Sequence, residues 1–534
     1  MKIRIFLSAL LLFVFTCDRQ LVGPLRDNPF DAENEKTSGD PFNLQTKNLS
    51  DHIRISWGYT FETPTPESYY LYRIDSFGLD AIYTGTDTTF QDNMVQWDST
   101  YSYYVTAKIN NKESPPPEVT ELPEVIRRIY VGEGMGYTNI GNALEIVDSG
   151  NVVYVMPGLY TERINFMGKT FKLFCSGEAG SCIIDGDGNG TVVTFSGGED
   201  SSSVLDGFTI TGGNNNDVYD GGGMTIRTGS DPQIHNCTFT NNSADFGGGV
   251  FVRQKAKPNF IGCNFETNTS TEDGGAIFCD RDSQPVIENC IFSGNSSNTG
   301  NGGAIAMDDA SPIITNCTFS GNFAAEGSGG ALSLSDLRDM TINNSQFISN
   351  TAKKGGAVYI YDAKDVQFTQ CRFESNSADF GGGIYIDDSG MTPVPVSFTN
   401  CILWQNSAYG GGGIYSDKSV VTVTYCTVSG NSASQNEGGG LYCKNSSEVT
   451  VMNSIYWQNT ADVNPEIFYD SSSTLAITYS DIEGGFTGEG NLNANPLFED
   501  ANNGDFQLQQ GSGCIETGQD STNMGAYGGA YGNW

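Results

Sequence analysis

Residues 302–322 read GGAIAMDDASPIITNCTFSGN, and this pattern recurs nine times between residues 221 and 461. Each copy opens with a glycine pair, a small residue and an aliphatic residue. The first glycines lie 26, 27, 28, 27, 26, 26, 30 and 27 residues apart. They are Gly221, Gly247, Gly274, Gly302, Gly329, Gly355, Gly381, Gly411 and Gly438. A fixed period of this length predicts a solenoid, in which each unit buries its apolar side only against its neighbours.

Two columns of the repeat predict buried strands. Strands of neighbouring coils lie ~4.8 Å apart, so residues at one phase of the period stack above each other. The apolar column contains Phe239, Phe265, Phe292, Phe319, Phe347, Phe373, Leu403, Val428 and Tyr456. Two residues earlier stand Cys237, Cys263, Cys290, Cys317, Ser345, Cys371, Cys401, Cys426 and Ser454. Their alternation with polar residues has a period of two, which is typical of strands with one buried face.

An asparagine follows each apolar column residue by three positions. The nine are Asn242, Asn268, Asn295, Asn322, Asn350, Asn376, Asn406, Asn431 and Asn459. An inward turn suits this column, because each side-chain amide can hydrogen bond to the next in a ladder. The glycine pairs supply a turn that needs positive φ or a close approach between coils.

The composition is strongly acidic, with 63 Asp and Glu against 27 Lys and Arg and a net charge of −36. Nucleic-acid binding rests on cationic side chains, so this balance argues against nucleic acid as a partner. It permits cations, basic partners or solubility outside the cell. Zinc is not expected, because the sequence has only His52 and His235 and no paired Cys/His spacing.

Seven of the 13 cysteines stand in the Cys/Ser column. Thiols stacked in this way are expected to be buried small hydrophobic groups rather than a disulfide framework. Cys175 and Cys182 lie outside the column, and they either form a disulfide or remain free.

Residues 1–17 predict a signal peptide, because Lys2 and Arg4 precede an apolar run that is too short to span a membrane. The run stops at Cys17 and resembles a bacterial lipoprotein signal, with Phe15 and Thr16 in place of the usual small residues. The resemblance implies lipidation of Cys17 and a membrane anchor. Ordinary secretion with cleavage nearby is the alternative. Residues 18–40 are expected to form a polar tether.

Residues 41–122 predict a small β-sandwich, with strand-like segments at 53–57, 69–74, 81–84 and 101–109 separated by turn residues. The stretch resembles a fibronectin type III domain. Trp57 fits the core tryptophan of the second strand, residues 70–73 fit the third strand, and Tyr101 fits the tyrosine corner. The resemblance implies a spacer or binding unit. Residues 123–128 are expected to form a stiff linker.

The solenoid is expected over residues 129–510, with an amphipathic cap at 142–146 and a C-terminal tail at 511–534. The Gly-rich end of this tail, residues 525–534, either packs against the coils or extends freely. Phe-x-x-Asn, as at 319–322, and Gly-Gly-Ala-aliphatic, as at 302–305, together resemble the repeats of chlamydial polymorphic outer-membrane proteins. More broadly, the region is similar to right-handed parallel β-helix proteins of the pectate-lyase-like superfamily. The resemblance implies an all-β fold with three strands per coil around a dry core. Display at the cell surface would rest on the lipid anchor.

Six or seven residues after its first glycine, nearly every copy of the repeat has a charged residue, which is Arg in the first two copies and mainly Asp in the later ones. The stacked positions are Arg227, Arg253, Asp280, Arg281, Asp308, Asp309, Asp336, Asp362, Asp387, Asp388 and Asp417. They predict an acidic edge with Arg at its N-terminal end, and Asp387 and Asp388 are candidates for binding a ligand there. Asp280, Asp282, Asp308 and Asp309 could offer oxygen ligands to Ca²⁺. Arg253 or Arg281 would be the nearest base for catalysis.

Two functions are consistent with this edge. The leading hypothesis is an exported protein at the cell surface or outer membrane, or secreted, that acts as an adhesin or glycan-binding structural module. Its partner would be a glycan or a protein of a host or cell surface. The competing hypothesis is a Ca²⁺-dependent lyase acting on uronic-acid polymers. A surface turn that uses Asp for conformational reasons would explain the same residues without any function.

Overall fold

A computed structural model describes residues 44–49, 52–58, 65–75, 78–95, 101–109, 111–114, 128–217, 219–387, 395–435, 437–529 and 531–532. The chain divides into two compact units, Met1–Arg127 and Arg128–Trp534. The predicted signal peptide with Cys17 and the predicted tether lie outside the described residues. In the described ranges, no helix is both long enough and apolar enough to cross a membrane.

The first unit contains two antiparallel sheets with one shared core, in the orders β1-β2-β5 and β4-β3-β6-β7. The strands are β1 (Gln45–Leu49), β2 (His52–Ser56), β3 (Ser68–Asp75), β4 (Gly78–Gly85), β5 (Thr89–Asp92), β6 (Ser102–Ile109) and β7 (Lys112–Glu113). Ile55, Leu71 and Val105 are fully buried in that core, and the rings of Trp57 and Tyr69 meet edge-on at 6.0 Å. The sheets agree with the predicted sandwich, while the fibronectin type III resemblance stays a prediction.

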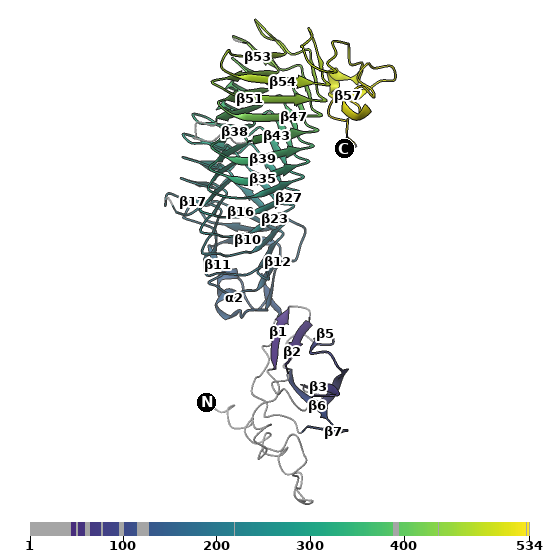
Figure 1. Ribbon diagram of the computed structural model, residues 1–534. Helices are drawn as coiled ribbons and strands as arrows, with labels where there is room; N and C mark the ends of the chain where they lie inside the picture. Colours follow the sequence, from purple (N-terminus) through teal and green to yellow (C-terminus); the bar gives the residue numbers. More distant parts are fainter. Residues whose placement is uncertain are drawn as a thin grey trace, which may run out of the picture. The chain divides into compact units, whose positions relative to one another are not determined.

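The second unit winds into a parallel β-helix (Figure 1). One sheet of 14 strands runs from β8 (Arg128–Val131) to β54 (Thr474–Thr478). A sheet of 13 strands runs from β10 (Gly158–Thr161) to β55 (Asp481–Ile482). A third sheet has 12 strands, so three main strands per coil are confirmed. A fourth sheet of nine short strands, from β17 (Asn214–Asn215) to β49 (Ser432–Ala433), follows the asparagine turn and was not predicted.

The 12-stranded sheet matters most for function. Its strands are β11 (Ile164–Asn165), β14 (Val193–Phe195), β18 (Met224–Ile226), β22 (Val250–Val252), β26 (Ile277–Asp280), β30 (Ile305–Asp308), β34 (Leu332–Ser335), β38 (Val358–Tyr361), β42 (Ile384–Asp387), β46 (Ile414–Asp417), β50 (Leu441–Lys444) and β53 (Ile467–Tyr469). Pairing is parallel and joins residues at the same phase of the repeat, so Ile277 faces Ile305 and Asp280 faces Asp308. Side chains of one column therefore lie one above another.

The predicted inward columns are confirmed. Every member of the apolar column is completely buried, and its phenylalanine rings from Phe239 to Phe373 stack with centroids 4.7 to 4.9 Å apart. The seven column cysteines are buried and free. Their thiols bond to backbone carbonyls, as Cys263 Sγ does with Ile234 O at 3.3 Å.

The asparagine ladder is also confirmed. Asn295 Nδ2 donates to Asn322 Oδ1 at 3.0 Å and to Phe265 O at 2.9 Å, and the same oxygen of Asn322 accepts the Asn295 backbone N–H at 3.0 Å. The pattern repeats from Asn242 to Asn459. Gly302 shows why the turn needs glycine: its φ is 66°, and a Cβ atom there would lie 2.3 Å from Ile305 O.

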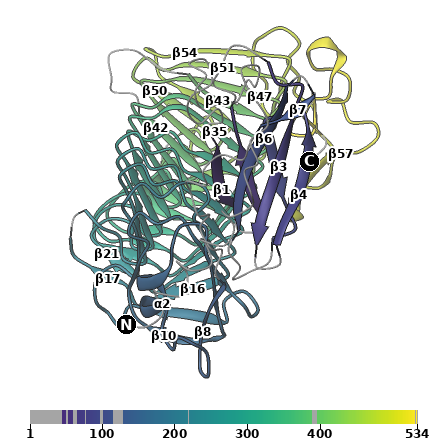
Figure 2. The same ribbon diagram turned by 90° about the horizontal axis from the view of Figure 1, so that it is seen from below.

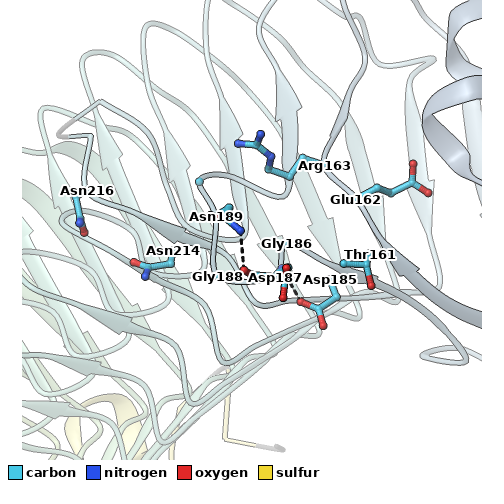
Figure 3. A pocket seen from close by; sticks show the side chains of 11 residues that line it. Thr161, Glu162, Arg163, Asp185, Gly186, Asp187, Gly188, Asn189, Asn214 and Asn216 are labelled. Atoms are coloured by element: carbon cyan, nitrogen blue, oxygen red, sulfur yellow. Dashed lines mark hydrogen bonds between the residues drawn. The ribbon is translucent and has the colours of Figure 1, made fainter.

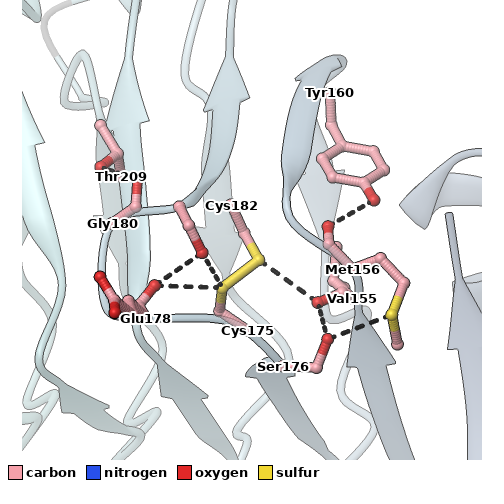
Figure 4. Close-up of a disulfide and its surroundings, with 10 residues drawn as sticks. Val155, Met156, Tyr160, Cys175, Ser176, Glu178, Gly180, Cys182 and Thr209 are labelled. Carbon is pink, nitrogen blue, oxygen red and sulfur yellow. Dashed lines mark hydrogen bonds between the residues drawn. A yellow bond between two sulfur atoms is a disulfide. The ribbon is translucent and has the colours of Figure 1, made fainter.

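The first coils are closed by the helix α2 (Ile140–Ile146), which includes the predicted cap and lies next to β8 (Figure 2). Asn139 caps its N-terminus, and the Glu162 carboxylate accepts the backbone N–H groups of Ile140 and Gly141 at 2.7 Å each. Ile140, Ala143 and Leu144 complete the core below it. Cys175 and Cys182 form a disulfide in these coils (Figure 4).

Parallel strands were expected up to residue 510, but the last one is β55. Beyond it, β56 (Phe498–Asp500) and β57 (Asp505–Leu508) form an antiparallel hairpin, with the 3₁₀ helix η1 (Ala501–Asn503) between them. Phe506 packs edge-on against Trp404 at 5.9 Å. In the following tail, which includes η2 (Gln519–Ser521), the carbonyls of Ala526 and Gly528 accept bonds from Asn400 Nδ2. The described part of the tail therefore packs against the coils.

Candidate functional site

The predicted Arg/Asp edge lies along the outer face of the 12-stranded sheet, where two columns of side chains point away from the core. The inner of these columns contains Thr225, Phe251, Phe278, Ala306, Ser333, Tyr359, Tyr385, Tyr415, Tyr442 and Phe468. The outer column, at the ends of the strands, contains Asp280, Asp308, Ser335, Tyr361, Asp387, Asp417 and Lys444. We call these two columns together the Asp–Tyr face.

The edge predicted from the sequence divides into two structurally different sets. Asp280, Asp308, Asp387 and Asp417 end strands and belong to the Asp–Tyr face. Arg281, Asp282, Asp309, Asp336 and Asp362 follow in the turn with φ between 46° and 60°. Asp and Asn tolerate this left-handed conformation better than most residues, which gives the aspartates of the turn a conformational role. Asp388 lies outside the described residues.

Arg253 is held at the N-terminal end of the face. Its side chain is 4% exposed, and its guanidinium lies 4.8 Å from the centre of the Tyr219 ring and 5.1 Å from that of Phe251. Arg253 Nε faces Asp280 Oδ1 at 3.9 Å, and both of these buried atoms lack a hydrogen-bond partner among the described residues. Arg253 is thus packed and paired rather than available as a base.

Asp280 sits between two arginines, because Arg281 Nε lies 3.6 Å from its other carboxylate oxygen. The pKa of Asp280 is raised to about 6, mainly by burial and to a smaller extent by Asp308 and Asp309, while Arg253 and Arg281 oppose the rise. Burial, Asp336 and Asp309 also raise the pKa of Asp308. These carboxylates therefore interact, yet the described residues contain no group of three or more His, Cys, Asp or Glu side chains placed to hold a metal ion. Asp282 instead faces Lys255 Nζ at 3.9 Å, with both side chains largely exposed.

The C-terminal half of the face is a network of opposite charges and phenols. Lys444 Nζ lies 3.1 Å from Asp417 Oδ2 and 5.2 Å from the centre of the Tyr415 ring. Lys354 Nζ, from the end of β37 (Thr351–Lys354), lies 3.9 Å from Asp387 Oδ2 and 4.8 Å from the Tyr385 ring centre. Tyr385 Oη donates to Asp417 Oδ2 at 3.3 Å. Four consecutive coils are thereby joined.

The pKa values in this network follow from its partial burial. Burial lowers the pKa of Lys444, but the bonds with Tyr415 and Asp417 raise it overall, so the ammonium stays charged. Burial and the nearby Asp417 carboxylate raise the pKa of Tyr385, so its phenol stays protonated. The surface accordingly offers fixed ammonium donors beside carboxylate acceptors, while the Tyr385 hydroxyl is bonded to Asp417.

The tyrosine rings do not offer free faces. Tyr385, Tyr415 and Tyr442 stack on one another with centroids 4.7 Å apart, and Phe468 follows at 4.8 Å. Tyr385 and Tyr415, in the stack, are only 3% and 5% exposed. A ligand would thus meet carboxylate and ammonium groups rather than a flat aromatic platform. The tyrosine column was missed from the sequence, because the same phase contains Thr, Phe, Ala and Ser in earlier coils.

A polar hollow of about 590 Å³ lies near the first coils (Figure 3). Its lining includes Arg163, Asp185, Asp187, Asn189 and Asn214. Asp185 Oδ1 accepts the backbone N–H of Asp187 at 2.9 Å, and Asn189 Nδ2 donates to the Asp187 carbonyl at 2.7 Å, so much of its polarity is used within its own loop. The sequence signal for it was the run Asp-Gly-Asp-Gly-Asn-Gly at 185–190.

A second cavity, of about 710 Å³, lies at the C-terminal end of the coils. Its lining includes Glu466, Tyr469, Glu483 and Phe486. Ile467 faces Leu441, so Glu466 occupies the same position of the coil as Gly440. In the earlier copies this position, the third of each copy, is occupied by a small residue. The sequence signal was therefore a glutamate in a Gly/Ala column. One carboxylate oxygen of Glu466 accepts the backbone N–H of Asn459 at 3.1 Å, and the other accepts Asn459 Nδ2 at 2.5 Å. Glu466 therefore ends the asparagine ladder.

Comparison with known proteins supports the fold. Residues 176–327 and 300–426 match the family model described as a right handed beta helix region. A search of the curated proteins gives no sequence match.

Three solved structures illustrate the remaining similarity. A family 28 exopolygalacturonase of Yersinia enterocolitica is 11% identical, with 82% of this chain and 99% of that chain covered and a TM-score of 0.28. The pectate lyase Pel3 of Pectobacterium carotovorum is 12% identical, with 55% and 91% covered and a TM-score of 0.13. The pectin methylesterase of Aspergillus niger is 13% identical, with 70% and 88% covered and a TM-score of 0.16. Such values carry no argument about function.

Proposed function

We propose that this right-handed β-helix is an exported binding protein that holds a glycan along the C-terminal half of its Asp–Tyr face. The observation that supports this proposal is the network of Lys354, Asp387, Asp417 and Lys444 with the tyrosine edges. Sugar hydroxyl groups both donate and accept hydrogen bonds, and this surface presents both kinds of partner in fixed positions. A long regular solenoid repeats such positions along its axis.

The mode of binding follows from the packing of the tyrosines. Because ring faces are occupied by neighbouring rings, affinity would come from hydrogen bonds to the outer column rather than from stacking of sugars on aromatic rings. The side chains of Asp387 and Asp417 are 20% and 16% exposed, so their oxygens are reachable without rearrangement of the sheet. A protein ligand with a polar surface is the other partner class that this face would accept.

The test is retention of a panel of neutral, amino-bearing and uronic-acid glycans on the immobilised full chain. We expect Asp387→Asn and Asp417→Asn together to weaken retention of the bound glycan by about tenfold or more, since each removes charge-assisted hydrogen bonds. Glu288→Gln is the matched control, because Glu288 points outward from β27 (Val286–Glu288) on the 14-stranded sheet. Retention of no glycan, or equal retention by the double variant, would refute the proposal.

The competing proposal is a Ca²⁺-dependent lyase acting on uronic-acid polymers at Arg253, Arg281, Asp280, Asp282, Asp308 and Asp309. It has less support, because Arg253 is buried under Tyr219 and paired with Asp280. Incubation of uronic-acid polymers with the protein and Ca²⁺ distinguishes the two functions. Release of unsaturated oligosaccharides that is lost in Asp308→Ala would establish the lyase in place of simple binding.

Export and anchoring are part of the same proposal and rest on the N-terminal sequence. The apolar run that ends at Cys17 supports attachment through a lipid to a cell-surface or outer membrane. Metabolic labelling with a fatty-acid probe tests it, with Cys17→Ser as the control. An exported protein that carries no label would be secreted without an anchor.

A further inference from the structure

The last strand of the 12-stranded sheet has an open edge. At the other end of this sheet, the first strand, β11, contacts the helix α2. The two other long sheets end at β54 and β55, and residues at these ends form hydrogen bonds with the chain that follows them. Tyr479 N, next to β54, donates to Glu489 O, and Ile482 N of β55 donates to Leu492 O. Within the part of the chain that the structure describes, β53 pairs only with β50.

The free backbone groups of this edge can be named. Glu466 O accepts the N–H of Leu441, and Asp470 N donates to Cys443 O, so the even-numbered residues here direct their backbone groups to β50. Alternation along a strand therefore directs the N–H and C=O groups of Ile467 and Tyr469 to the opposite edge. No backbone or side-chain group among the described residues bonds to them there.

The cavity of about 710 Å³ lies over this edge, since Ile467 and Tyr469 are part of its lining. Ile482 and Phe486 provide further apolar wall, and the rings of Tyr469 and Phe486 are 6.3 Å apart. An extended peptide that paired with β53 would place alternate side chains into this space. Main-chain hydrogen bonds would supply affinity, and the cavity would supply selectivity.

The negative charge of the cavity favours a cationic side chain as its occupant. Glu466 and Glu483 line it, and none of its lining residues is Lys, Arg or His. Glu466 is only 5% exposed, and Glu483 Oε2 accepts the backbone N–H of Gln458 at 2.7 Å. Burial and the neighbouring Glu483 raise the pKa of Glu466 to about 8, which is the expected response of a carboxyl pair without a counterion. A cationic side chain would supply that counterion.

We propose that an extended, basic segment of a partner protein adds as a strand to β53, with a Lys or Arg side chain beside Glu466 and Glu483. A second copy of this chain is a poorer occupant. The net charge is −36, and end-to-end pairing of two copies would bring the same acidic cavities together.

The test uses the full chain and a fluorescent peptide, acetyl-Thr-Val-Lys-Val-Thr-amide, in an anisotropy titration. We expect saturable binding that weakens by about tenfold or more when the peptide lysine is replaced by glutamate. A peptide with N-methylated backbone amides at the two valines should lose binding, because it cannot pair with a strand edge. Equal binding of the N-methylated peptide would refute strand addition.

Variants locate the site. Glu483→Gln should weaken peptide binding by about tenfold while leaving the ladder contact of Glu466 with Asn459 in place. Glu466→Gln should do the same, and its thermal unfolding shows whether the end of the coil stack is intact. Glu448→Gln, on the exposed side of β51 (Glu448–Met452), is the matched control and should bind like the original protein. Unchanged binding in both cavity variants, or sedimentation that shows self-association lost in Glu483→Gln, would overturn the proposal.

Discussion

Asparagine has two different roles in this protein, and its position in the coil decides which. The ladder asparagines are completely or almost completely buried, and their amides bond to the next coil. Another set, including Asn316 and Asn344, lies at the turns between strands with φ of 55° and 46° and bonds across the surface. The first role comes from hydrogen bonding and the second from backbone conformation.

We expect Asn322→Ala to lower the free energy of unfolding by about 2–4 kcal/mol, because it removes the acceptor of the buried Asn295 backbone N–H, one acceptor of Asn295 Nδ2 and the side-chain donor to the Phe292 carbonyl. Urea unfolding followed by circular dichroism measures this. Asn259→Ala is the control, since Asn259 makes one side-chain bond, to Gln233, on the outer surface. Its loss should cost less than about 1 kcal/mol. Equal costs for the two variants would show that the ladder contributes no special stability.

Glu466 makes stability depend on pH. Its pKa is raised from 4.5 to about 8 in the folded protein, so the folded state favours the protonated form. Stability from this group is complete below about pH 4.5 and is lost as the pH rises towards about 8. We expect Glu466→Gln, which stays neutral, to raise the melting temperature at about pH 9 by several degrees and to change it little at about pH 4. Calorimetry at both pH values measures this, and an equal shift at both would refute the assignment.

The elements show how far the sequence determines the fold. The inward columns and the cap helix were predicted, because a buried position recurs in every coil and tolerates few residue types. The fourth sheet was missed because two-residue strands are too short to show an alternating pattern. The described residues of the Arg/Asp edge lie partly at strand ends and partly in the turns that follow. Which of these residues end a strand and which lie in a left-handed turn depends on the residue at which each strand ends. No residue type in the repeat indicates that boundary.

The candidate site was predictable only in part for a similar reason. Asp280, Asp308 and Asp387 were identified, but their partners Lys354 and Tyr385 lie at other phases of the repeat. Glu466 was missed because it belongs to the coil in which the repeat pattern ends. Repetition reveals what every coil shares, whereas a site is assembled from residues that only one or two coils possess.

The disulfide stabilises one short loop in the first coils. It joins cysteines seven residues apart, and a loop of this size corresponds to about 2.5 kcal/mol in the chain-entropy account. We expect dithiothreitol to lower the melting temperature of the protein. The double variant Cys175→Ser, Cys182→Ser is the control and should not respond, because the ten free cysteines of the described residues are buried. A response of the double variant would mean that another thiol pair is involved.

At the scale of the whole molecule, the net charge of −36 opposes the compact state through repulsion between like charges. We expect the melting temperature to rise as NaCl increases from about 10 mM to about 300 mM, because salt screens this repulsion. KCl at the same ionic strength is the control and should have the same effect. Calcium chloride at matched ionic strength separates screening from binding, since stabilisation beyond that of NaCl requires a site in the folded protein. A melting temperature that falls with added NaCl would show that ion pairs such as Arg253–Asp280 dominate over net repulsion.

The in-phase stacking of the columns also limits how such a gene can change in length. Loss or gain of one residue within a strand would turn every following side chain of that strand to the other face. Duplication or removal of one complete coil, however, would join an asparagine to an asparagine and a phenylalanine to a phenylalanine across the new boundary. Viable length variants of this protein should therefore differ by whole coils, with small insertions confined to the outer turns, as the spacing of 30 residues between Gly381 and Gly411 already illustrates.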